Sequence, residues 1–178
     1  MLLLYISKFL IKYKKQNIFN PVVFAIGITT LLALFMPGMD LPPLDWSGID
    51  IRFSIFGTAF PLSLIFITLS LIFNVGRVRK HPLALSFIAS SLLLGFIINS
   101  YDGNYLSFII STAFIGSAII VEPKTSPVKT GEQLIYGISM ALLIMGLSLL
   151  DVPNVPIIGL LLGNAFYFLY KKFLTPSH

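Results

Sequence analysis

The chain has 178 residues, of which 56 % are hydrophobic and 11 % are charged, and its net charge is +5. A soluble domain carries about 25 % charged residues, and a folded chain of ~150 residues leaves about 30 % of its surface in water. This much apolar surface therefore cannot be hidden in one core, which excludes a disordered tail and a free soluble enzyme. The fold class that remains is an all-α integral membrane protein.

The composition also narrows the cofactors and partners. The absence of cysteine excludes disulfides, thiol nucleophiles and iron–sulfur clusters. The chain has two histidines, and one of them is the terminal His178. So few histidines disfavour a haem bound by two histidines and a histidine-rich metal site. Lysines and arginines cluster beside apolar runs, as in loops that anchor membrane proteins and unlike a nucleic-acid surface. We expect membrane lipid as a partner and no nucleic acid.

Residues 1–15 precede the first long apolar stretch. Leu2–Ile6 come before the lysines, which is the reverse of a signal peptide. Lys8, Lys12 and Lys15 share one face of a helix, which favours an amphipathic helix at the membrane interface over the frayed end of a span. The predicted organisation is thus an interfacial helix over 1–15, a membrane bundle over 16–172 and a short tail over 173–178.

Six stretches of the bundle contain no charged residue, and a helix that crosses the ~30 Å hydrocarbon layer needs about 20 residues. The stretches are 16–39, 53–76, 82–101, 103–121, 133–150 and 152–170. A charge at mid-bilayer costs ~2.5–3.5 kcal/mol on insertion scales, so this pattern predicts a polytopic bundle of about six spans. Pro61 lies inside the second stretch, where we expect it to kink the helix or to start a second half-helix, so broken or re-entrant half-helices are an option.

The connections between these stretches alternate in charge. Basic residues precede the first stretch and follow the second, fourth and sixth, whereas aspartates mark the connections after the first, third and fifth. Lysine and arginine concentrate on the cytoplasmic side of membrane proteins. We therefore expect a cell-membrane protein with both termini in the cytoplasm.

Four short motifs follow one another in the chain. They are Asn17-Ile18-Phe19-Asn20-Pro21, Glu122-Pro123-Lys124-Thr125-Ser126-Pro127, Leu134-Ile135-Tyr136-Gly137 and Gly163-Asn164-Ala165-Phe166. In this order, and with the basic segment Arg77–Lys80 between the first two, the chain from Asn17 to Phe168 resembles one family. That is the NqrB/RnfD family, whose members are membrane subunits of the sodium-translocating NADH:quinone reductase and of the Rnf electron-transport complex.

The resemblance implies a helical membrane subunit that couples electron transfer to ion movement. Larger relatives carry flavin mononucleotide on a threonine in a Ser-Gly-Ala-Thr-Pro-Leu motif. The nearest match is 57–62, in which Phe60 stands in the threonine position and Thr58 two positions earlier. The resemblance therefore implies a flavin near Thr58. It also implies a soluble flavin- and nicotinamide-binding reductase, or other electron-transport subunits, as partners. Because larger relatives contain two helical halves, a homodimer is compatible with this shorter chain.

Four further side chains are candidates for the site. Asn20 either caps a helix with Pro21 or marks a half-helix whose amino end faces a flavin phosphate. Glu122 is either a solvated loop carboxylate beside Lys124 or a cation or proton acceptor at a pathway mouth. Thr125 caps the next turn or lines the same mouth, and Asn164 is either a site residue or a hydrogen bond between helices.

The first functional hypothesis is a subunit of a flavin-linked electron-transport complex that moves electrons between a cytoplasmic reductase and a membrane carrier. Asn20, Thr58 and Thr125 would then contact the cofactor, and Glu122 and Asn164 would lie on an ion path. The alternatives are a small-solute channel or transporter and a membrane anchor for a soluble reductase. No catalytic set such as Ser–His–Asp is present in the sequence, so the chain would carry electrons without being a catalytic subunit itself.

Overall fold

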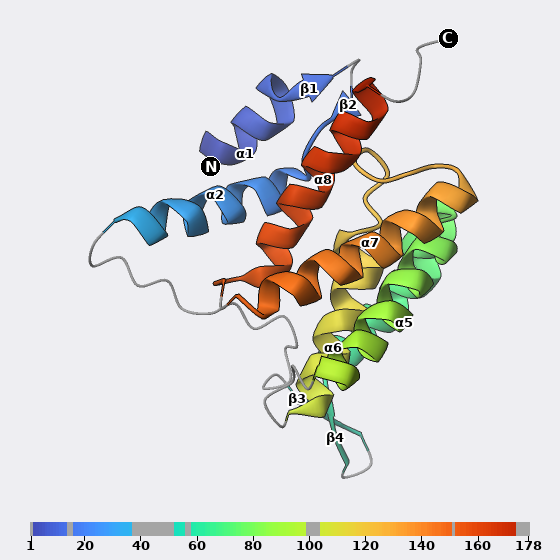
Figure 1. The fold of residues 1–178 in the computed structure, drawn as a ribbon. Coiled ribbons are helices and arrows are strands. Elements are labelled where there is room, and N and C mark those ends of the chain that lie inside the picture. Colours follow the sequence, from blue (N-terminus) through green and yellow to red (C-terminus); the bar gives the residue numbers. More distant parts are fainter. Residues whose placement is uncertain are drawn as a thin grey trace.

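The computed structural model describes residues 2–13, 16–36, 52–55, 58–98, 104–150 and 152–173. Most of these residues are helical, which confirms the all-α class at the level of the fold (Figure 1). The elements in chain order are α1 (Leu2–Tyr5), η1 (Ile6–Leu10), β1 (Lys12–Tyr13), β2 (Gln16–Asn17), α2 (Pro21–Phe35), β3 (Arg52–Ile55), β4 (Thr58–Pro61), α3 (Ser63–Leu69), η2 (Ser70–Val75), α4 (Gly76–Val78), α5 (His81–Ile98), α6 (Tyr105–Phe114), η3 (Ile115–Ile119), α7 (Thr130–Ser148) and α8 (Val155–Phe173), where η marks π-helical turns.

Each of the six uncharged stretches contains one helical segment, but their lengths differ. Among the described residues, α5 and α7 are the two helices that are long and apolar enough to cross a membrane. Three shorter apolar segments run over Pro21–Ala33, Ser63–Val78 and Tyr105–Ile119. The structure therefore supports six helical segments without establishing six full spans.

The predicted interfacial helix is shorter than expected. It is helical over Leu2–Leu10, and β1 and β2 then pair antiparallel, with Lys12 opposite Asn17 and Tyr13 opposite Gln16. The helix ends at Leu10 because Ile11 leaves helical geometry, with φ of −94° and ψ of 77°. The predicted boundary at residue 15, between the interfacial helix and the membrane bundle, stays a prediction.

The second stretch begins with a hairpin rather than a helix. β3 pairs antiparallel with β4, with Arg52 opposite Pro61 and Ile55 opposite Thr58. The residue before a proline avoids helical geometry, so Phe60 favours the strand and the helix begins only at Ser63. Both predictions for Pro61 are wrong, because Pro61 ends a strand and the described residues before it form a hairpin and not a first half-helix.

Two π-helical turns lie against each other through a polar contact. The wider turn of a π-helix changes which carbonyls are bonded within the helix. In η3 the Ser117 carbonyl oxygen accepts from Ser70 Oγ at 2.8 Å and from Asn74 Nδ2 at 3.2 Å. These bonds join the second helical segment to the fourth and satisfy the amide of Asn74 inside the bundle.

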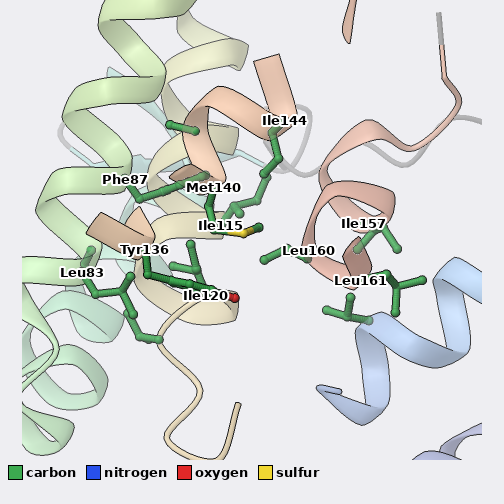
Figure 2. Packing of buried hydrophobic residues seen from close by; sticks show 14 of the residues in the cluster. Leu83, Phe87, Ile115, Ile120, Tyr136, Met140, Ile144, Ile157, Leu160 and Leu161 are labelled. Carbon is green, nitrogen blue, oxygen red and sulfur yellow. The ribbon is translucent and has the colours of Figure 1, made fainter. Parts of the chain in front are cut away.

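The core is centred on α7. Buried residues of α2, η2, α5, η3, α7 and α8 form one cluster, and Figure 2 shows Tyr136 and Met140 of α7 between Leu83 of α5 and Leu160 of α8. The α5–α7 pair is the most extensive helix contact. It is close because Gly137 has no side chain: a Cβ there would lie 2.9 Å from the Leu83 carbonyl oxygen. This packing fixes α7 against α5 along its length.

Candidate functional site

The second helix beside α7 is α8, and the two helices meet closely and then diverge. A Cβ at Gly159 would lie 2.5 Å from Ile144 Cγ1, and a Cβ at Gly163 would overlap Met140 Sδ. Glycines at this spacing allow close helix packing. Beyond Gly163 larger side chains replace glycine, and a groove opens between the two helices.

The groove has a volume of about 510 Å³. One wall comes from a single face of α7 and the other from a single face of α8. The lining residues are Glu132, Ile135, Tyr136, Ser139, Met140, Leu143, Gly163, Phe166, Tyr167 and Tyr170. Small-molecule pockets typically measure about 300–1,000 Å³ and combine apolar walls with a few polar groups. The groove matches that description.

Three of the four aromatic rings that line this groove belong to tyrosines, and the fourth is Phe166. The ring centroids of Tyr136 and Tyr167 are 5.3 Å apart in an edge-to-face arrangement, and those of Tyr167 and Tyr170 are 6.4 Å apart and nearly parallel. Lys171 Nζ lies 5.2 Å from the centroid of the Tyr167 ring. The groove therefore offers aromatic faces inside and positive charge near its mouth.

The polar groups of the groove are tied to fixed partners. Tyr136 donates its hydroxyl hydrogen to Asn164 Oδ1 at 2.8 Å, and both side chains are buried. Tyr167 donates to Glu132 Oε2 at 3.4 Å, and Glu132 Oε1 lies 3.9 Å from Lys129 Nζ. These contacts hold two tyrosine rings in place, which suits a site that receives a flat ring.

Asn164 is thus next to the groove rather than inside it. It is buried behind the wall and fixes the hydroxyl end of Tyr136. The prediction that this amide bonds between helices is confirmed. Its role on an ion path stays a prediction.

Glu122 and Thr125 are brought together in the loop between η3 and α7. The Thr125 amide donates to the Glu122 carbonyl oxygen at 3.3 Å, and the Thr125 side chain is near enough to the Glu122 carboxyl group to influence its pKa. Burial raises the pKa of Glu122, against the opposing effects of Lys124 and Thr125. In the described part of the chain, its Oε2 is buried without a hydrogen-bond partner. Glu122 is therefore a partly desolvated carboxylate and not a freely solvated one.

Asn20 and Thr58 lie on other elements. Asn20 Oδ1 accepts from the amides of Val22 at 2.9 Å and Val23 at 3.3 Å, so the predicted helix cap is confirmed. The cap uses two amides that a half-helix would otherwise offer to an anion. Thr58 is the first residue of β4, the second strand of the hairpin.

Glu132 and Tyr167 were not identified from the sequence, whereas Tyr136 and Lys80 lay within the Leu134–Gly137 motif and the basic segment Arg77–Lys80 without an assigned role. The groove residues have a recognisable pattern, because they recur at spacings of three and four residues along each helix. They include Glu132, Tyr136 and Ser139 on α7 and Gly163, Phe166 and Tyr170 on α8. Lys80 gave no such signal, because it is one of several basic residues in a short segment.

Within the described residues, no group of three or more histidine, aspartate or glutamate side chains could hold a metal ion. No family model, curated protein or solved structure matches the chain. The resemblance to the electron-transport family thus rests on its short motifs. Two of them, Leu134–Gly137 and Gly163–Phe166, contribute residues to opposite walls of the groove.

Proposed function

We propose that the chain is an integral membrane subunit of a flavin-linked electron-transport complex, and that the groove between α7 and α8 holds its planar redox ring. The observation that carries this proposal is the convergence of two motifs on one aromatic groove. Tyr136 belongs to the Leu134–Gly137 motif, and Gly163 and Phe166 belong to the Gly163–Phe166 motif. The resemblance supplies the chemistry of the ligand, and the groove supplies a place of suitable size.

The membrane part of the proposal is supported by the outer faces of the helices. Only 28 % of the apolar window in α5 and 39 % of that in α7 is buried, whereas a core helix of a soluble protein would be mostly buried. Large apolar side chains such as Leu93, Ile135 and Phe73 are more than 60 % exposed. Soluble monomers rarely show such continuous apolar surfaces. Lipid is the natural solvent for these faces.

The contacts of the basic segments support the predicted orientation. Lys80, between α4 and α5, hydrogen-bonds Ser126 and Pro127 of the next basic connection. Lys171 at the end of α8 is close enough to influence Lys80 electrostatically. The opposite end of α5 contacts the start of α6, where the ring centroids of Phe96 and Tyr105 are 6.0 Å apart. We propose six segments in the membrane with these basic connections on the cytoplasmic side.

The ligand chemistry follows from the groove walls. Aromatic side chains in the walls favour a flat aromatic molecule such as a flavin or the ring of a membrane carrier. Hydroxyl and carboxylate groups at one end can bond its polar edge, and Lys171 near the mouth can attract a phosphate. A flavin attached near Thr58 is the other arrangement that the resemblance implies.

The test is the visible spectrum of the purified chain before and after denaturation. A flavin released by denaturation supports the groove, and one retained by the unfolded chain supports attachment near Thr58. Tyr136→Phe should weaken retention of a groove-bound flavin, whereas Leu142→Ala, on an exposed part of α7, should not. A colourless preparation that takes up no flavin on reconstitution would contradict the proposal.

A second candidate is a membrane anchor for a soluble reductase. Arg77, Arg79, Lys124 and Lys129 are exposed and belong to connections at the same end of the bundle. An acidic partner could bind there through complementary charge. Reversing the charge of Arg77 and Arg79 should abolish co-purification if the chain is an anchor, while Lys80 is buried and unsuitable for docking.

A further inference from the structure

Lys80 occupies an unusual corner between two helices. Arg79 adopts left-handed geometry with φ of 53°. Its amide bonds the Gly76 carbonyl at 3.2 Å, and the Lys80 amide bonds the Val75 carbonyl at 3.1 Å. These two bonds form a Schellman motif, which ends a helix and reverses the chain. The Lys80 carbonyl then accepts the first bond of α5, from Ala84 at 3.0 Å.

The Lys80 side chain is buried although it is charged. It is 3 % exposed, and its ammonium group lies 3.0 Å from the Ser126 carbonyl oxygen, 2.7 Å from Ser126 Oγ and 2.6 Å from the Pro127 carbonyl oxygen. An ammonium group has three donors, so all three are used. Every partner is a neutral oxygen, so Lys80 binds the loop without forming an ion pair in this cage.

The loop that receives Lys80 is closed on itself. Ser126 Oγ, one of the three acceptors, also donates to the Glu122 carbonyl oxygen at 2.6 Å. Thr125 and Ser126 are 7 % and 4 % exposed. Lys80 thus holds Ser126, and Ser126 holds the Glu122 backbone at the start of the loop. Withdrawal of Lys80 would leave two carbonyls and a hydroxyl without their common donor.

We propose that Lys80 is a latch that holds the Glu122–Pro127 loop closed, and that its release exposes the Glu122 carboxyl group at the basic end of the bundle. Lys80 is a positioning residue in this device, because it acts on Glu122 through the loop. The role of the exposed carboxylate as a pathway mouth rests on the proposed function. The latch itself depends only on the contacts of Lys80.

The electrostatics of the latch predict its pH dependence. Burial, with a further contribution from Lys171 on α8, lowers the pKa of Lys80 from 10.5 to about 8. Within the loop, the Glu122 carboxyl group interacts with Lys124 and Thr125. The closed loop therefore binds the Lys80 proton less tightly than an open loop would. By linkage, closure strengthens as the pH rises from about 8 to 10.5 and is independent of Lys80 titration below that range.

The absence of native cysteine allows a direct test by thiol labelling. Thr125→Cys places a thiol at a buried loop position, and Lys124→Cys places one at an exposed neighbouring position. The ratio of their labelling rates corrects for the pH dependence of the thiol itself. Each probe is combined with Lys80, Lys80→Met, Lys80→Arg and, separately, Ser126→Ala.

We expect Lys80→Met to raise the labelling rate of the Thr125→Cys probe about tenfold or more, because buried acceptors lose their donor. The exposed probe should not change. Lys80→Arg, which keeps the charge and its donors, should retain slow labelling, and Ser126→Ala should have an intermediate effect. With native Lys80 the corrected rate should fall as the pH rises above 8.

Unchanged labelling of the buried probe in a folded Lys80→Met variant would overturn the latch. If that variant does not fold, the Ser126→Ala variant decides, and no increase in labelling of the buried probe would then overturn the proposal. None of these measurements needs a flavin, so loss of the latch and loss of the proposed electron-transport function are separate results.

Discussion

The two sides of α7 contrast sharply, although both depend on glycine. On the α5 side, Gly137 lets the helix backbones approach so closely that a Cβ would lie 3.0 Å from the Phe87 amide nitrogen. On the α8 side, Gly159 and Gly163 bring the helices together, but tyrosines then separate them and leave a groove. Glycine spacing thus fixes where helices meet, and the residues that follow decide whether the interface stays closed.

The largest effect should come from breaking the closed side. Gly137→Leu forces a side chain against the Leu83 and Phe87 backbone, which cannot move without moving α5. Overpacking of this kind costs about 3 kcal/mol. Thermal unfolding in detergent should show a large loss of stability. Gly146→Leu, on the same helix at a position where an added Cβ would meet no atom within 4 Å, should be nearly neutral; equal losses would contradict this account of the closed side.

The wall of the groove should be the next most sensitive place. Tyr136→Phe keeps the ring and the packing but leaves Asn164 Oδ1 without its donor. An unpaired buried acceptor costs about 1–3 kcal/mol, and a hydrogen bond between membrane helices averages about 0.6 kcal/mol. From these magnitudes we expect a loss of about 1 kcal/mol in unfolding in detergent. Tyr170→Phe, on the exposed end of α8, is the control. A similar loss of stability in this control would contradict a stabilising role of the hydrogen bond between Tyr136 and Asn164.

The corner before α5 should respond in the opposite direction. Arg79 holds a left-handed conformation that costs an L-residue about 1–2 kcal/mol and glycine almost nothing. Arg79→Gly should therefore raise the unfolding temperature, with a gain below about 1 kcal/mol because glycine also has a more flexible unfolded state. Arg77→Gly, in the helical turn just before the corner, should lower it. A loss of stability with Arg79→Gly would show that the arginine side chain matters more than the strain.

The smallest effect on stability should come from the open side. Ser139→Leu introduces the same side chain as Gly137→Leu, but it points into the groove at an exposed position. We expect a change within about 0.5 kcal/mol, as for ordinary surface substitutions. A loss comparable to that of Gly137→Leu in the same unfolding assay would mean that the groove is closed in the folded chain.

The positions of the helices could be predicted because charged residues separate the apolar stretches from one another. Asn20 and Pro21 also identified the start of α2 correctly, since a cap and a first-turn proline act locally. The β3–β4 hairpin was missed because an apolar run has no periodicity that distinguishes a strand from a helix segment. The exclusion of helix geometry before Pro61 was the local signal that could have identified it.

The candidate site was predictable only where its residues are neighbours in the chain. Glu122 and Thr125 lie in one loop, so their contact follows from a single turn. Tyr136 and Asn164 are brought together by the crossing of α7 and α8, which depends on Gly159 and Gly163 of α8 packing against side chains of α7. Lys80 and Ser126 are 46 residues apart in the sequence, and no local pattern predicts a contact between them.

The most direct test of the central claim is a titration of the purified, flavin-free chain with flavin mononucleotide, followed by quenching of flavin fluorescence. The account predicts saturable binding that Ser139→Leu weakens about tenfold or more by filling the groove, while Gly146→Leu, away from it, leaves binding unchanged. Equal affinity in both variants, or no saturable binding to the native chain, would contradict the assignment of the groove.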